Sequence, residues 1–454
     1  MVNKKGMHLA HKTDSSDHYV NHLSDVKTNN KLIATESIHN EFGVLLVPKG
    51  TEIEHRVLDF LTGHKMQKQL DELLTIEGCL TNTTLEQEFY KFLTQYPDVA
   101  QLHESTNFAQ TLKHLCTVQQ IPRILLQKLT VLKIQLPVVF EQTLFSTLLG
   151  CMLAKEMKFE QKALRNVFYI GLLHDLGLLH IDPALVSKQG DFTDEQWRTL
   201  KSHMMISVAI AKSIYPFDDE VYRGIKEHHE RCDGTGYPKE LHQEQLCISG
   251  QLIGLADIVC HIRTRQYNQS GKSMANIMPY IQINLHSFKF ESYQAMYSIL
   301  RGAELELTDL LDRKDFIAMP KRLILQRVRI SQLHQVFSDF VAEIPQEIKG
   351  KHCRALLDSC KHLTDTIKRA GFNSSETLDW LESINDDDYT ESHLELQELD
   401  DMHYELLWLF KKTFRIIPEF LKEELPPSSP LLAQFEAQSA TMQQNLLSAW
   451  TDYS

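Results

Sequence analysis

Two pairs of adjacent metal-binding side chains stand out in this sequence. His174 and Asp175 end the apolar run VFYIGLLHD, and His228 and His229 open the segment HHERCDGTGYP. Burying a carboxylate beside an imidazole costs free energy unless the charge finds a partner, and a metal ion would supply one. Neighbouring residues on a helix point about 100° apart, so such a pair is better placed to contact two neighbouring ions than to chelate one. The two pairs therefore predict a site with two metal ions.

Two further polar residues lie in apolar stretches of the same region. His203 begins HMMISVAIAKSI, and Asp257 lies within SGQLIGLADIVC. Most of the 22 histidines are expected to be ordinary surface or core residues, so the pattern carries the argument rather than the count. Imidazole and carboxylate groups without a thiolate suit iron, manganese, zinc or nickel, and we expect iron or manganese.

Helices are predicted to position these residues. From Leu85 onward apolar residues recur at spacings of three and four, as in LEQEFYKFL and PRILLQKLTVL. Before them, KLIATESI (31–38) and GVLLVPKG (43–50) are typical of β segments joined by turns, and a helix is predicted over 54–64. We expect a mainly α chain with a small α+β module and polar leader over 1–80, a helical domain over 81–284, and a helical region of unknown function over 285–454.

Composition excludes several classes of protein. The chain has 454 residues, enough for roughly three domains, and its formal net charge of −13 disfavours a nucleic-acid groove binder or an anionic-membrane clamp. The eight cysteines form no CxxC pair, which fits reduced thiols. No uninterrupted apolar run approaches the roughly 18 residues of a membrane span, and no signal-peptide core follows the first residues. We expect a cytoplasmic protein without a nucleic-acid or membrane partner.

Residues 165–265 resemble the HD-GYP family of metal-dependent phosphohydrolases, whose members typically hydrolyse cyclic di-GMP or related cyclic dinucleotides. The resemblance rests on HDLG, on IDPALVSKQGDFTDEQW and on HHERCDGTGYP, which reproduces the signature of the family almost completely. The segment 31–64 is similar to a small module that often precedes this domain. The resemblance implies an HD-GYP-type helical bundle with a cyclic dinucleotide as ligand.

The resemblance also implies roles for individual residues. Asp175 would bridge two divalent transition metal ions and would act in catalysis together with His174. The implied metal ligands are His174, Asp175, His203, His228, His229 and Asp257. The implied substrate-binding positions are Asp233, Gly236, Tyr237 and Pro238 in the loop, with Arg265 as a loosely matched basic position beyond it.

The sequence departs from the family at three positions. Where the family has an upstream histidine ligand, VVFEQTLFSTLLG offers only Glu141 or Gln142; Leu178 replaces a lysine, and Cys260 replaces a second aspartate. Losing a cation beside the phosphate would cost about 3 kcal/mol of transition-state stabilisation. Two hypotheses stay open: a weakened cyclic di-GMP phosphodiesterase with two-metal chemistry, or a degenerate, non-catalytic signalling or adaptor protein that binds a nucleotide or a protein partner. A Glu141 that faces the metal cluster would favour the first.

The last third of the chain shows no recognisable chemistry. Leu399, Met402, Leu406 and Leu409 form an apolar stripe suited to a helical bundle core or to a dimer seam, and the bundle core is the favoured alternative. We also predict a homodimer or a partner complex through residues 320–450, with this stripe as the candidate seam.

Overall fold

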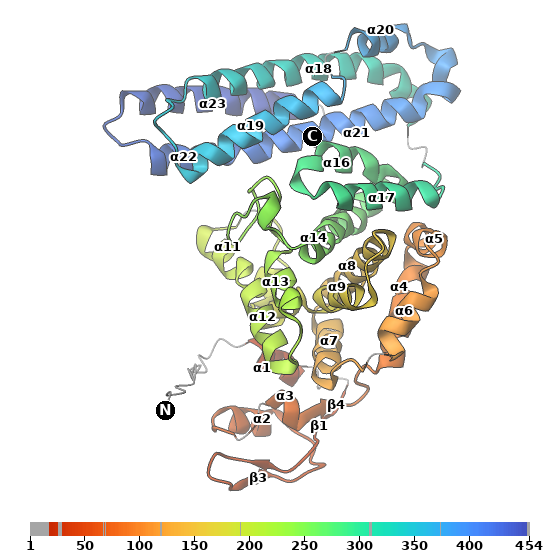
Figure 1. Ribbon diagram of the computed structural model, residues 1–454, viewed down its shortest axis with the longest axis vertical. Coiled ribbons are helices and arrows are strands. Elements are labelled where there is room, and N and C mark those ends of the chain that lie inside the picture. The colour runs from red at the N-terminus through yellow and green to blue at the C-terminus, as the bar shows by residue number, and fades with distance from the viewer. Residues whose placement is uncertain are drawn as a thin grey trace. The chain divides into compact units, whose positions relative to one another are not determined.

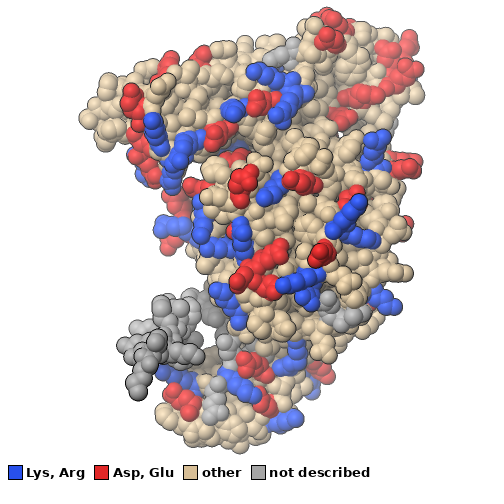
Figure 2. All heavy atoms as spheres, viewed as in Figure 1, with Lys and Arg blue, Asp and Glu red and all other residues tan. Residues whose placement is uncertain are grey.

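The computed structural model describes residues 18–25, 30–66, 68, 70–118, 120–190, 192–307, 311–372 and 374–451. Helices dominate it, with a small strand-containing module at the N-terminal end (Figure 1), which confirms the predicted mainly α fold. Most of the predicted polar leader lies outside the described residues. The contacts within the chain divide it into two units. Figure 2 shows Lys and Arg interspersed with Asp and Glu over the face that it draws.

The N-terminal module has the predicted β segments followed by a helix. Two short antiparallel pairs form it: β1 (Leu32–Ala34) with β4 (Leu74–Ile76), and β2 (Ile38–His39) with β3 (Leu45–Val47). The Asn40 side chain accepts hydrogen bonds from the backbone of Phe42 and Val44, and Gly43 has a φ of 79°, so a tight turn joins β2 to β3. Its helices are α1 (His18–Asp25), α2 (His55–Thr62) and α3 (Leu70–Leu73).

The first unit comprises residues 1–97, 107–228 and 252–257, and its core is helical. Helix α8 packs against α9, and Gly171 on α9 permits a close approach: a Cβ there would lie 2.5 Å from the Thr147 hydroxyl oxygen on α8. This contact fixes the end of α9, where the first metal-binding pair begins. The main helices of the unit are α4 (Asn82–Gln95), α7 (Arg123–Gln135), α8 (Pro137–Glu156), α9 (Gln161–Leu173), η3 (Leu176–His180), α11 (Asp194–Lys201), α12 (His203–Ile214) and α13 (Asp219–Glu227).

Helix α8 has the length and apolar composition of a membrane span, although polar residues interrupt its apolar sequence. However, 78% of the most apolar stretch of this helix is buried inside the protein, as in the core helix of a helical bundle. All eight cysteines are free thiols, and seven of them are buried.

The second unit comprises residues 98–106, 229–251 and 258–454. Helices α18, α21 and α23 pack on one another, and α19 packs on α22. Several residues of these helices, among them Phe337, Phe410 and Phe435, share one apolar core. The bounds are α16 (Met278–Ile283), α17 (Phe290–Gly302), α18 (Arg313–Ala342), α19 (Lys351–Arg369), α20 (Ser375–Ser383), α21 (Tyr389–Phe414), α22 (Ile417–Glu424) and α23 (Pro430–Trp450).

The apolar stripe on α21 belongs to this packing. Leu406 and Leu409 are buried in the shared core, Met402 packs against it, and Leu399 packs against a second cluster around Phe316. Leu406 and Leu409 therefore belong to the bundle core, as the first alternative predicts, whereas Leu399 and Met402 are only partly buried. A homodimer or partner complex through residues 320–450 stays a prediction.

Candidate metal centre

Helix ends position five of the six predicted metal-binding residues, whereas Asp257 lies within helix α14 (Ile248–His261). Helix α9 ends at Leu173, so His174 and Asp175 follow its last turn. Helix α12 begins at His203, and α13 ends immediately before His228. Helix ends leave backbone groups without partners in the helix, and polar side chains can occupy these positions without breaking a helical hydrogen-bond ladder.

Three of the four histidines are held in the same way. In each, the ring Nδ1 donates a hydrogen bond to the backbone carbonyl three residues earlier, which belongs to the last turn of α9, α11 or α13. A proton on Nδ1 leaves Nε2 with its lone pair, the form of imidazole that binds a metal ion. The three bonds run from His174 to Gly171, from His203 to Leu200 and from His228 to Ile225, each at 2.7 Å.

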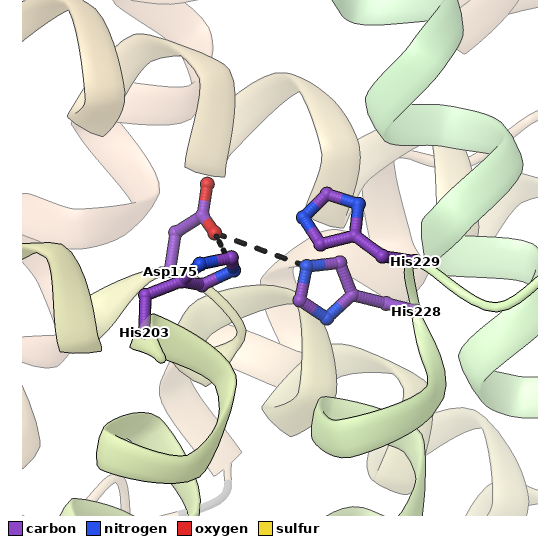
Figure 3. A group of neighbouring side chains, drawn as sticks. All are labelled: Asp175, His203, His228 and His229. Carbon is purple, nitrogen blue, oxygen red and sulfur yellow. Dashed lines mark ion pairs between the residues drawn. The ribbon is translucent and has the colours of Figure 1, made fainter. Parts of the chain in front are cut away.

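The three Nε2 atoms surround the carboxylate of Asp175. The Nε2 atom of His174 lies 3.4 Å from one carboxylate oxygen. Those of His203 and His228, which Figure 3 shows, lie 3.4 Å and 3.9 Å from the other oxygen. Burial, partly offset by the Asp175 charge, lowers the pKa of His203 and favours the neutral ring. Lone pairs on neutral imidazoles repel a carboxylate unless a cation lies between them. The donor set therefore fits a divalent metal ion.

The six predicted ligands fall into two groups. The metal-binding atoms of Asp175, His203, His228 and His229 lie within 4.8 Å of one another, as do those of His174, Asp175 and Asp257. Asp175 belongs to both groups, which is the arrangement that a bridging carboxylate requires. Figure 3 shows the side chains of the first group pointing toward one another. Binding of metal by these six residues stays a prediction.

The loop after His229 contains the remaining signature residues. We call residues 229–242 the signature loop. The ring of Tyr237 stacks on that of His229, with ring centroids 4.7 Å apart, and a Cβ on Gly236 would lie 2.3 Å from the backbone nitrogen of Arg231. Tyr237 is followed by a cis peptide bond to Pro238, which is exposed. The stacking brings one aromatic side chain of the loop against a predicted metal ligand.

Asp233 has a different environment from a free, ligand-facing carboxylate. One oxygen accepts hydrogen bonds from the backbone and the hydroxyl of Thr235, at 3.0 and 2.6 Å. The other accepts from the Ser287 hydroxyl at 2.7 Å and pairs with Lys412 at 3.2 Å. Both oxygens are thus engaged within the protein, which favours a role in shaping the loop.

Two of the positions at which the sequence departs from the family, Glu141 and Leu178, are hydrogen-bonded to another residue or buried. Glu141 accepts a hydrogen bond from the Tyr96 hydroxyl, and it belongs to none of the groups of His, Cys, Asp and Glu among the described residues that could hold a metal ion. Leu178 is buried within η3, with 8% of its surface exposed. Arg265 is exposed in η5 (Ile262–Tyr267).

Sequence reasoning missed Glu230. This residue is fully buried, and its carboxylate accepts hydrogen bonds from the backbone of Lys239 at 2.6 Å and of Leu241 at 2.9 Å. Glu230 therefore closes the signature loop on itself. An acidic residue directly after two histidines was the available signal. The partners Ser287 and Lys412 lie too far from Asp233 in sequence to have given one.

Comparison with known proteins gives a match to part of the chain. Residues 129–290 match the family described as HD domain. The 3'3'-cGAMP-specific phosphodiesterase 3 of Vibrio cholerae is 28% identical over 145 residues, which cover 32% of this chain and 31% of the relative. The cyclic di-GMP phosphodiesterase of Thermotoga maritima is 28% identical over 163 residues, covering 36% and 44%. The cyclic di-GMP phosphodiesterase PdeB of Borreliella burgdorferi is 30% identical over 138 residues, covering 30% and 36%. The chain thus spans less than half the length of each of these relatives.

Proposed function

Because the chain carries an HD domain similar to those of HD-GYP phosphodiesterases, we propose that it hydrolyses a cyclic dinucleotide, with cyclic di-GMP as the first candidate. One observation carries the proposal beyond the resemblance. Three imidazoles, each with its Nδ1 proton donated to a helix-end carbonyl, turn their Nε2 lone pairs toward the Asp175 carboxylate. Such a set of donors suits a divalent cation.

Two ions, iron or manganese, would be held by the two groups that share Asp175. Bound there, the metal would acidify a water molecule and neutralise charge on the phosphate oxygens. The proposed ligands are His174, Asp175, His203, His228, His229 and Asp257.

The protein itself would orient the ligands and the substrate. The carbonyls of Gly171, Leu200 and Ile225 hold the imidazole protons and fix the planes of the rings. Tyr237, stacked on His229, offers an aromatic face against which a base could lie. The signature loop, closed by Glu230, would hold this face in place.

We expect hydrolysis to be slow. The side chain of Leu178 supplies no charge where the family has lysine, and removing one donor that stabilises a transition-state oxyanion costs about a hundredfold in rate. This loss leaves the chemistry possible if the metal is bound.

A specific observation favours the second candidate function, a non-catalytic protein that binds the nucleotide or a partner. Glu141 is hydrogen-bonded to Tyr96 and belongs to neither metal-capable group of the described residues, so it supplies no substitute for the upstream histidine. A site short of one ligand could bind metal and nucleotide without turnover.

One experiment tests both candidates. The full chain is loaded with Fe(II) or Mn(II) without oxygen, its metal content is measured, and cyclic di-GMP and 3'3'-cGAMP are offered. We expect bound metal and a linear dinucleotide product; Asp175→Ala should lose both, whereas Asp194→Ala, at an exposed acid of α11, should keep both. Nucleotide binding without product supports the non-catalytic protein. Metal content no higher than that of Asp175→Ala contradicts the metal centre.

A further inference from the structure

The signature loop is tied to a helix far along the chain within the second unit. The Nζ atom of Lys412, near the end of α21, lies 3.2 Å from the Asp233 carboxylate and 3.4 Å from the Ser287 hydroxyl. Ser287 donates to the same Asp233 oxygen at 2.7 Å, and its carbonyl accepts the Cys232 backbone N–H at 3.1 Å. Lys412 and Ser287 therefore hold one carboxylate oxygen together.

The two oxygens of Asp233 have separate tasks. The oxygen that faces Thr235 accepts from the backbone two residues later and organises the turn inside the loop. The oxygen that faces Ser287 and Lys412 has no part in this turn and connects the loop to the rest of the unit. Breaking the second set of contacts would leave the internal turn intact and free its position.

The charge of Lys412 is needed because Asp233 is buried. Only 8% of the Asp233 side chain is exposed, and a buried carboxylate without a cation is costly. Burial acts to raise the pKa of Asp233, but Lys412 and the hydrogen bonds from Thr235 and Ser287 outweigh it and hold the pKa well below its usual range. Burial lowers the pKa of His286, and that of His362 to about 4, so both nearby rings are neutral near pH 7.

We infer that Lys412 is a positioning residue: through Asp233 it holds the signature loop in place, so that helix α21 controls how Tyr237 is presented at His229. Tyr237 lies in the same closed loop, four residues after Asp233, and its backbone N–H donates to the His229 carbonyl at 3.2 Å. A shift of the loop must therefore move the stacked aromatic ring. The part of the inference that concerns turnover rests on the proposed function, whereas the restraint on the loop does not.

The neighbouring lysine provides a matched control. The ammonium of Lys411 lies 4.6 Å from the ring centroid of Trp408 and 5.5 Å from that of Trp450. Lys411→Met removes the same charge from the same turn of α21 without touching Asp233. Lys412→Arg keeps a cation at the tested position, and Ser287→Ala removes one hydrogen bond to the same oxygen while leaving the ion pair.

The first measurement is hydrogen exchange of residues 231–242 in the full chain. In Lys412→Met the loop should open roughly tenfold more often than in the wild type, because the free energy lost is that of about one charged hydrogen bond. In Ser287→Ala the increase in opening should be smaller. Lys411→Met should match the wild type, and Lys412→Arg should restore most of the protection. The inference is overturned if the loop exchanges at the same rate in the wild type, Lys412→Met and Ser287→Ala. It is also overturned if Lys411→Met speeds exchange as much as Lys412→Met does.

The second measurement concerns the metal-loaded enzyme and cyclic di-GMP. Lys412→Met should raise KM about tenfold with metal content unchanged, because the loop presents the substrate rather than the metal. An unchanged KM in a variant whose loop exchanges faster overturns the link to Tyr237. If no variant, the wild type included, turns over substrate, the proposed function fails, and the exchange measurement still decides whether Lys412 holds the loop.

Discussion

At the scale of single residues, the centre is defined by where protons are held. The Nδ1 protons of three histidines go to carbonyls in the last turns of three helices, the region where helical backbone carbonyls commonly lack partners within the helix. Each of these hydrogen bonds thus gives a helix-end carbonyl a donor and leaves the Nε2 lone pair of the imidazole available to a metal ion. Asp175 then lies where the lone pairs meet.

The sharing of Asp175 predicts unequal effects of two substitutions. Asp175→Ala should remove metal from both groups, because both use this carboxylate. His229→Ala should empty only the group of His203 and His228, leaving that of His174 and Asp257 able to hold its ion. Elemental analysis of the two variants checks this. Equal loss of metal from both would contradict a bridging role for Asp175.

Leu178→Lys is predicted to raise the rate of cyclic di-GMP hydrolysis at equal metal content. The added ammonium would neutralise charge on the phosphate, and the gain should reach at most about a hundredfold. Because Leu178 is buried, the lysine should also lower the melting temperature. Leu178→Met, similar in size and uncharged, is the control for both measurements. A rate no higher than that of the methionine variant would show that this position does not limit the chemistry.

The sequence could predict the candidate ligands but not what holds the loop. The chemistry of His174, His228 and their neighbours follows from residue type and local spacing, and both can be read directly from the sequence. Asp233 and Lys412 are 179 residues apart, and no periodicity links them. The partner of Glu141 could not be predicted either, because the sequence of a helix does not show whether a tyrosine or a metal ion will contact its carboxylate.

At the scale of elements, α21 has distinct sides with different tasks. Leu406 and Leu409 lie in the bundle core, while Asp401 and Glu405 line a cavity of about 450 Å³ together with Lys272. Lys272 forms an ion pair with Asp401. Among the described residues, no hydrogen bond or ion pair is made by the Glu405 carboxylate. Burial, and then the charge of Asp401, raise the pKa of Glu405 to about 8.

This raised pKa predicts how stability depends on pH. A carboxyl whose pKa rises from 4.5 unfolded to about 8 folded contributes stability that is fully present below pH 4.5 and lost as the pH rises through 8. Glu405→Gln resembles the protonated form, so it should unfold like the wild type at low pH and be more stable by about 4 kcal/mol near pH 8.

Urea unfolding of both proteins at two pH values measures this difference. Glu419→Gln, at an exposed acid of α22, is the control for removing a charge and should show no such dependence. A constant difference between Glu405→Gln and the wild type at both pH values would mean that Glu405 keeps an ordinary pKa.

At the scale of the whole molecule, periodicity predicts the fold class but cannot distinguish a bundle core from a dimer seam. The β segments near 31–50 and the helices after residue 85 have spacings that only one kind of element satisfies, so they could be read directly. The stripe on α21 has the same spacing in a bundle core and in a dimer seam. Its assignment therefore depended on long-range packing, which supplies partners for Leu406 and Leu409 within the chain.

Leu406→Glu tests whether this stripe serves the fold or an assembly. Leu406 is 0% exposed, so the glutamate would be buried without a partner, and we expect lost helicity, a lower melting temperature or precipitation. Leu447→Glu places the same charge on α23 at a leucine that is 63% exposed and should leave circular dichroism and melting unchanged. A Leu406→Glu protein that stays helical and changes only from dimer to monomer in light scattering would contradict the core assignment. That result would support the stripe as a dimer seam. A residue that packs against a second chain can be replaced without unfolding its own chain, whereas a core residue cannot.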